Sequence, residues 1–170
     1  MAYYKEIVTK AVIGKGKKTT KEKFDVKINE GIDNVLGCWV INHNFTGLIN
    51  NNNIVVSGNY DVNIWYSYDN NTKTNVVIKT FNYTDPMKVR IKENSKLTNN
   101  SEIIVRTLNQ PSVIDVEVVD GFVNLVIEKQ MGVEVIGDTK VRVSVQDDFD
   151  EYEEIEDDDI DMDINEDYLK

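Results

Sequence analysis

One cysteine, Cys38, and one histidine, His43, are the chain's only candidates for thiol-type nucleophilic chemistry. That chemistry needs the two side chains within hydrogen-bonding reach of each other. Five positions apart on an extended strand, they would point to opposite faces of a sheet. A single histidine is also too little for a histidine-based metal site in one chain. We therefore predict no catalytic residues, no metal site and no cofactor, and a protein that is not an enzyme.

Cys38 has no second cysteine in the chain with which to form a disulfide. Two interpretations stay open. Cys38 is buried as a small apolar side chain, or it is a reactive thiol that forms an intermolecular disulfide with another molecule.

A basic segment, residues 14–18 (Gly-Lys-Gly-Lys-Lys), superficially resembles a phosphate-binding loop. It lacks the Walker spacing, in which the second glycine is followed by Lys and Ser or Thr. We expect either a solvated loop or a contact for an acidic partner, such as the acidic end of another copy. The net charge of −11 opposes approach to phosphate groups, so no nucleic acid partner is expected.

The end of the chain differs sharply in composition from the rest. Residues 147–170 contain 14 acidic residues and one lysine, which leaves 16 acidic and 18 basic residues for 1–146. A like-charged block of this density repels itself and buries too little apolar surface to fold alone. We predict a folded domain over residues 1–146 and a disordered, acidic, flexible tail over 147–170.

Apolar side chains interrupt the acidic residues of this tail. Alternation of this kind is typical of disordered segments that dock on a partner. Aspartates at every second position from 157 to 163 suggest a calcium loop, but the turning glycine and the closing glutamate are missing, so no specific calcium site is expected. We hypothesise that the tail binds client proteins through Tyr152, Ile155, Ile160, Ile164 and Tyr168.

The clearest structural signal is a strict two-residue alternation over residues 54–69. Even positions are mostly apolar or aromatic and odd positions mostly polar, which predicts a long strand with one buried face. Residues 69–72 (Asp-Asn-Asn-Thr) predict a hairpin turn, followed by a strand over 76–83. Further strands are predicted near residues 6–13, 23–28, 38–42, 89–92, 103–108, 113–119, 122–128 and 133–145.

These short β-branched runs are separated by turns rich in Asn and Gly, such as residues 50–53 and 120–121. No segment has a sustained helical period. We predict an all-β, antiparallel β-sandwich or barrel-like body. No signal peptide and no membrane-spanning run is recognisable, so no membrane insertion is expected.

Trp65 interrupts the polar face of the long predicted strand. A large aromatic residue on a face that should meet water is a candidate interface anchor, unless another element covers that face. Trp39 lies in an apolar run and is predicted to be in the core. We hypothesise that Tyr60, Trp65 and Tyr66 belong to a strand that mediates self-association, with Trp65 in the interface itself.

Several segments, in order along nearly the whole chain, resemble a known family, the outer spore coat morphogenetic protein E of endospore-forming bacteria. The most distinctive is residues 58–68 (Gly-Asn-Tyr-Asp-Val-Asn-Ile-Trp-Tyr-Ser-Tyr). The others are residues 4–12, 37–43 (Gly-Cys-Trp-Val-Ile-Asn-His), 71–74, 110–111 and 134–141, together with the acidic end.

This resemblance implies a structural morphogenetic protein of the spore coat. Such a protein is made in the mother-cell cytoplasm and ends in the spore coat at the spore surface. It self-associates around the forespore, attaches through a basement-layer morphogenetic protein, and recruits outer spore coat proteins. The alternative is an acidic-tailed β-domain chaperone for basic client proteins, which would form small closed oligomers.

Overall fold

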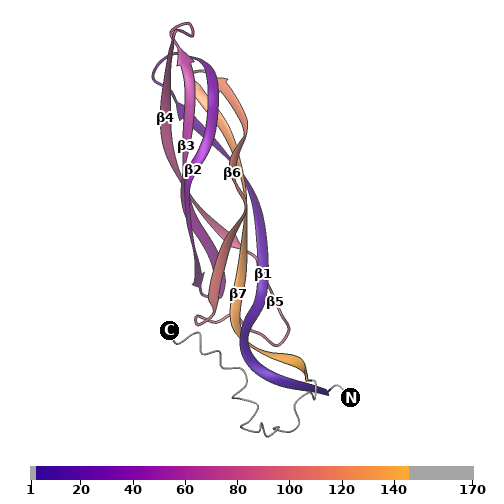
Figure 1. Cartoon of the computed structure of the whole chain (residues 1–170). Coiled ribbons are helices and arrows are strands. Elements are labelled where there is room, and N and C mark those ends of the chain that lie inside the picture. The colour runs from indigo at the N-terminus through magenta and orange to yellow at the C-terminus, as the bar shows by residue number, and fades with distance from the viewer. Residues whose placement is uncertain (1–2, 146–170) are drawn as a thin grey trace, which may run out of the picture. The chain divides into compact units, whose positions relative to one another are not determined.

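The computed structural model describes residues 3–145, which form strands and turns and contain no helix. The strands are β1 (Tyr3–Lys27), β2 (Ile32–Asn50), β3 (Asn53–Tyr68), β4 (Lys73–Met87), β5 (Arg90–Ile91), β6 (Glu102–Val119) and β7 (Phe122–Val145). They form two sheets, ordered β5-β1-β7-β6 and β2-β3-β4 (Figure 1). The prediction of an all-β antiparallel body is confirmed.

The described residues divide into two compact units, Val8–Thr139 and a second unit that includes residues 3–7 and 140–145. In the described part of the second unit, the Arg142 guanidinium lies 5.5 Å from the centre of the Tyr4 ring, a cation–π distance. The predicted division into residues 1–146 and 147–170 stays a prediction. The five tail residues proposed to bind clients, Tyr152 to Tyr168, lie outside the described residues.

In the larger unit, most of the buried apolar residues come from two strands, one in each sheet. β3 is the central strand of the β2-β3-β4 sheet, and β7 belongs to the β5-β1-β7-β6 sheet. Alternate residues of both strands are almost completely buried, as the sequence alternation predicted for β3. The core rows are Ile54, Val56, Tyr60, Val62, Ile64 and Tyr66 from β3, and Val123, Leu125, Ile127, Met131, Val133 and Val135 from β7. Their shared burial provides the main hydrophobic stabilisation of this unit.

Asn and Asp residues close the turns, as predicted. Asn51 and Asn52 (φ 48° and 66°) join β2 to β3, and residues 69–71 (φ 55–62°) join β3 to β4. Asp120 and Gly121 (φ 50° and 81°) join β6 to β7 in the left-handed backbone that a two-residue hairpin requires.

Several strands are longer than predicted, because exposed polar residues do not interrupt backbone pairing. β1 unites the strands expected near 6–13 and 23–28, and β7 unites those expected near 122–128 and 133–145. The expectation of a loop at residues 14–18 is therefore wrong, since this basic segment lies within β1. Gly14 and Lys15 of this segment pair with β5.

Candidate interaction surface and buried ion cluster

Two tryptophans lie next to each other on the outer face of the β2-β3-β4 sheet. Trp65 is 41% exposed, and Trp39 is 42% exposed, so the prediction that Trp39 is a core residue is wrong. Trp39 is paired with Asn63 of β3, an odd-numbered position on the side opposite the core row. A β-carbon on Gly37 would lie within 4 Å of both indole rings, which places both rings over this glycine.

Aliphatic side chains extend this aromatic pair across all three strands. The register aligns Trp65 with Val76 and aligns Asn63 with Ile78 on β4. We call the following residues the outer apolar face: Trp39 and Ile41 from β2, Trp65 from β3, and Val76 and Ile78 from β4, each at least 40% exposed. An exposed apolar cluster of this kind marks an interaction surface more often than a solvated face.

A polar residue is buried within the outer apolar face. Asn63 lies between Trp39 and Ile78 in the register and is only 7% exposed. Its side-chain oxygen Oδ1 has no hydrogen-bond partner among residues 3–145. A buried acceptor without a partner costs about 1–3 kcal/mol, so this asparagine is held in place at a cost in stability.

Hydrogen-bonded polar groups border this face at one end. Asn42 donates to Asp61 Oδ2 at 3.0 Å, and Thr80 donates to Asp61 Oδ1 at 2.5 Å. The bonds from Thr80 and then Asn42 lower the pKa of Asp61, so the carboxylate stays charged. An apolar centre with a polar rim is the usual layout of a protein–protein interface.

Tyr60 and Tyr66, the other two residues of the self-association hypothesis, lie on the opposite side of β3. Both are buried in the core, at 1% and 2% exposure. The Tyr66 hydroxyl donates to Glu30 at 2.8 Å, which lowers the pKa of Glu30. The structure thus separates Trp65 on the outer face from two tyrosines that support the strand from within. The role of all three in self-association stays a prediction.

The interior between the sheets holds a cluster of charges that we did not predict. The Lys129 side chain of β7 is 2% exposed, and its Nζ lies 3.1 Å from Asp85 Oδ2 of β4 and 3.7 Å from Glu22 Oε1 of β1. Nζ also donates to Thr20 Oγ1 at 2.7 Å and lies 4.0 Å from the centre of the Tyr83 ring. The ion cluster therefore connects the two sheets through buried groups.

The burial of Lys129 could have been predicted from the sequence. Lys129 continues the odd-numbered apolar row of β7, between Ile127 and Met131. Because our predicted strand ended at residue 128, the lysine was not recognised as a core position. A cationic residue in an otherwise apolar row is the pattern that could have revealed it.

His43 borders this cluster from β2. Its Nε2 lies 2.6 Å from the Tyr83 hydroxyl oxygen. Burial and the charge of Lys129 lower the pKa of His43. Burial and the nearby charges of Asp85 and Glu22 raise the pKa of Tyr83 to about 12. The histidine is thus held neutral and the tyrosine protonated.

The prediction that Cys38 and His43 point to opposite faces is wrong. A register shift between Ile41 and Asn44, with Asn42 in the left-handed region (φ 56°), resets the alternation of β2. His43 therefore faces the interior tyrosines, and Cys38 packs against the core on the same side. Burial raises the pKa of the Cys38 thiol, which disfavours the thiolate. An intermolecular disulfide through Cys38 stays a prediction.

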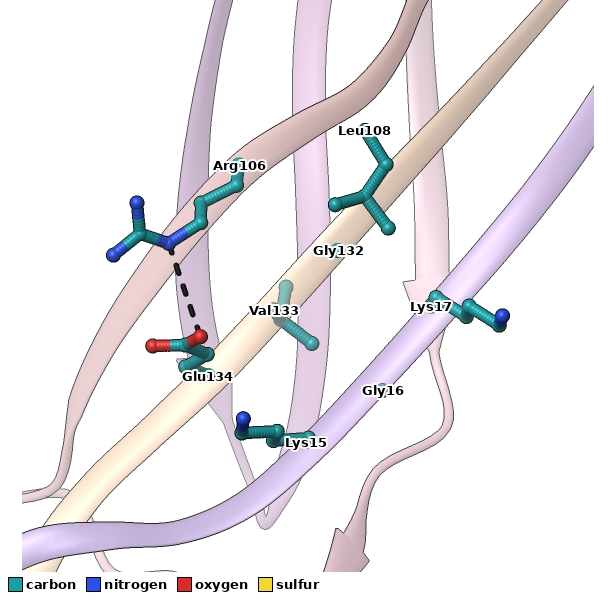
Figure 2. A pocket seen from close by; sticks show the side chains of 8 residues that line it. All are labelled: Lys15, Gly16, Lys17, Arg106, Leu108, Gly132, Val133 and Glu134. Atoms are coloured by element: carbon teal, nitrogen blue, oxygen red, sulfur yellow. Dashed lines mark ion pairs between the residues drawn. The ribbon is translucent and has the colours of Figure 1, made fainter.

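The basic segment of β1 borders a hollow of about 420 Å³, shown in Figure 2. The Lys15 side chain extends toward the side on which Glu134 lies, whereas Lys17 extends the other way. Arg106 already pairs with Glu134 at 3.8 Å. Since these cations do not converge on one point, the hollow does not form a built anion site. Contact with an acidic partner here stays a prediction.

Within residues 3–145, no three His, Cys, Asp or Glu side chains lie close enough together to hold a metal ion. No helix of that region has the length and apolar character needed to cross a membrane.

Comparison with known proteins identifies the family. The family model of outer spore coat protein E (CotE) matches residues 3–170. The chain belongs to this family. Its members are structural proteins of the outer spore coat, which confirms the resemblance found in the sequence. Nothing matches among curated proteins, and nothing matches among solved structures.

Proposed function

We propose that this outer spore coat protein E self-assembles by packing the outer apolar face of one copy against that of another. The observation that carries this proposal is the pair of exposed tryptophans over Gly37. Burial of these side chains by a second copy would remove apolar surface from water.

The position of β3 in its sheet favours face packing over strand addition for this contact. β3 is hydrogen-bonded along both edges, to β2 and to β4, so it has no free edge for another strand. Only the outward side chains of β3 are available to another molecule. Trp65 is thus the direct contact in this proposal, and Tyr60 and Tyr66 support the strand from the core.

The acidic residues 147–170 have a separate role in the proposal. Copies assembled side by side would display many acidic segments, and each could bind an outer coat protein weakly. Multivalency would supply the strength of recruitment. In this account the protein is made in the mother-cell cytoplasm, attaches to the forespore through a basement-layer morphogenetic protein, and recruits clients into the spore coat.

The test compares the assembly state of the full chain with that of a Trp39→Ser/Trp65→Ser variant, by light scattering and electron microscopy. We expect large ordered assemblies for the unaltered chain and a shift to much smaller species for the variant. Circular dichroism should show unchanged β content, because both side chains lie outside the core. Ile114→Ser is the matched control, since Ile114 is an exposed apolar residue of the other sheet (48% exposed).

Unchanged assembly size in the tryptophan variant would reject the proposed interface. A small closed oligomer of the unaltered chain would instead favour the acidic chaperone. A version ending at Gln146 separates the two roles, since it should assemble fully but bind fewer coat proteins.

A further inference from the structure

The ion cluster around Lys129 is the most unusual chemical arrangement in the described residues, and the assembly function does not use it. Amine and carboxylate meet at 3.1 Å in the core, where the lysine side chain is 2% and the aspartate side chain 11% exposed. A second carboxylate, Glu22, lies 3.7 Å from the same nitrogen. The exposed pair Lys21–Glu128, one position along both strands, has no such surroundings, since Lys21 is 64% exposed.

We propose that Lys129 and Asp85 react with each other in the folded chain to form an intramolecular amide (isopeptide) bond. The amide would join β7 of one sheet to β4 of the other. Each chain would react once on itself, so the chain is the substrate of its own modification and turns over no other molecule.

The reaction is a condensation that needs no oxidant, reductant or cofactor. A proton passes from the Lys129 ammonium to the Asp85 carboxylate, which gives a neutral amine and a neutral carboxylic acid. The amine nitrogen attacks Cγ of Asp85, and the new N–C bond forms. Glu22 accepts a proton from this nitrogen and delivers it to the departing hydroxyl group. The C–O bond breaks, one water leaves, and Glu22 returns to its starting state.

The surroundings favour each step of this reaction. The lysine lies in a row of apolar β7 residues, including Ile127, Met131 and Val133. A buried ion pair carries a desolvation penalty, which condensation to an uncharged amide would remove. Fixed neighbours also react as if at very high concentration, with effective molarities of roughly 10⁵–10⁸ M for well-oriented groups.

Two further contacts position the nitrogen. Thr20 Oγ1 accepts a hydrogen bond from Nζ, and the Tyr83 ring holds the ammonium by a cation–π contact before the proton moves. Asp85 and Tyr83 are two residues apart on β4, so both face the lysine from the same strand. Of the two carboxylates, Asp85 is the nearer to the nitrogen, at 3.1 Å against 3.7 Å for Glu22.

Intact-mass spectrometry of the purified, denatured full chain tests the proposal. The unaltered chain should be lighter than its sequence specifies by the mass of one water. Proteolysis should release a branched peptide that contains both Lys129 and Asp85. Lys129→Arg and Glu22→Gln should each retain the full mass of their sequences. Asp85→Asn should form the same bond with loss of ammonia in place of water. Lys21→Arg is the matched control and should still lose one water.

Two outcomes would overturn the inference. One is an unaltered chain that keeps its full mass both when freshly purified and after prolonged incubation in the folded state. The other is a water loss that persists in Lys129→Arg, which would identify dehydration of a different residue. The mass of the unaltered chain decides the matter even where a variant fails to fold. The mass of the denatured chain does not depend on assembly size. The proposed amide bond can therefore be rejected without rejecting the proposed function, and the reverse also holds.

Discussion

The outer apolar face and the buried ion cluster are opposites in polarity. On the outer face of the β2-β3-β4 sheet, Trp39 and Trp65 are exposed to solvent. In the interior, Lys129 and Asp85 are removed from it. Both regions depart from the rule that apolar groups are buried and charged groups exposed, and both depend on β-strands that otherwise follow it.

The difference between the two regions lies in how each departure is compensated. The interior charges have partners within the chain, because Lys129 contacts Asp85, Glu22, Thr20 and the Tyr83 ring. The outer face has no such compensation within residues 3–145, since its apolar side chains stay at least 40% exposed. An internal network of this kind points to a role within one chain, and an uncompensated surface points to another molecule.

Removing the Lys129 cation from the interior should have the largest effect on stability. Lys129→Met leaves Asp85 buried without a cation, and we expect the free energy of unfolding to fall by about 3–5 kcal/mol. Loss of the proposed amide would add to this effect. Lys21→Met, which removes an exposed pair, should change stability by less than about 1 kcal/mol. Urea denaturation measures both, and equal effects would show that burial does not distinguish the two pairs.

Crowding the contact between Tyr83 and His43 should have the next largest effect on stability. A β-carbon at Gly58 would lie 2.6 Å from the Tyr83 hydroxyl oxygen and closer still to the backbone oxygen of Asn44. Gly58→Ala should therefore displace the tyrosine from His43 and cost about 1–3 kcal/mol of stability. Gly31→Ala is the control, since nothing lies within 4 Å of that position. Thermal unfolding of both variants tests this, and a stable Gly58→Ala chain would contradict the packing.

A substitution in the outer apolar face should raise the free energy of unfolding, whereas the two preceding substitutions lower it. Asn63→Val removes a buried acceptor without a partner, so the isolated chain should gain about 1 kcal/mol in free energy of unfolding. Asn82→Val, at an exposed position of β4, should change stability by less than about 0.5 kcal/mol. Destabilisation by Asn63→Val would mean that the asparagine is satisfied within its own chain.

The smallest expected effect is a pH dependence from His43. Its pKa in the fold is lowered from 6.5, so below that pH the unfolded chain takes up a proton that the folded chain does not. Stability should fall as pH drops below 6.5, by less than about 0.8 kcal/mol at about pH 6. The difference in denaturation midpoint between the chain and His43→Gln, followed from neutral pH downward, isolates this contribution. A difference that does not change with pH would show that His43 is not held neutral.

Much of the fold was predictable from local patterns. The alternation of residues 54–69 placed β3 and its buried face, because a two-residue period is imposed by strand geometry itself. Asn and Asp clusters placed three hairpin turns, because those residues tolerate left-handed backbone. The order of resembling segments identified the family over nearly the whole chain, which the match to residues 3–170 confirms.

The candidate sites were only partly predictable. Trp65 was identified because it breaks a local alternation. Trp39 was misplaced, because only its pairing with Asn63 shows on which face it lies. His43 was misplaced for a related reason, since a single bulge at Asn42 reverses the alternation and nothing in the local pattern marks it.

Sequence alone therefore determined the strand class, the turns, the concentration of acidic residues at the end and the family. Those properties depend on composition and on neighbours along the chain. Tertiary structure decided that Lys129 of β7 meets Asp85 of β4 and Glu22 of β1, and that two tryptophans share one outer face. These contacts join residues far apart in the chain, and they depend on strand order and register, which a two-residue period leaves open.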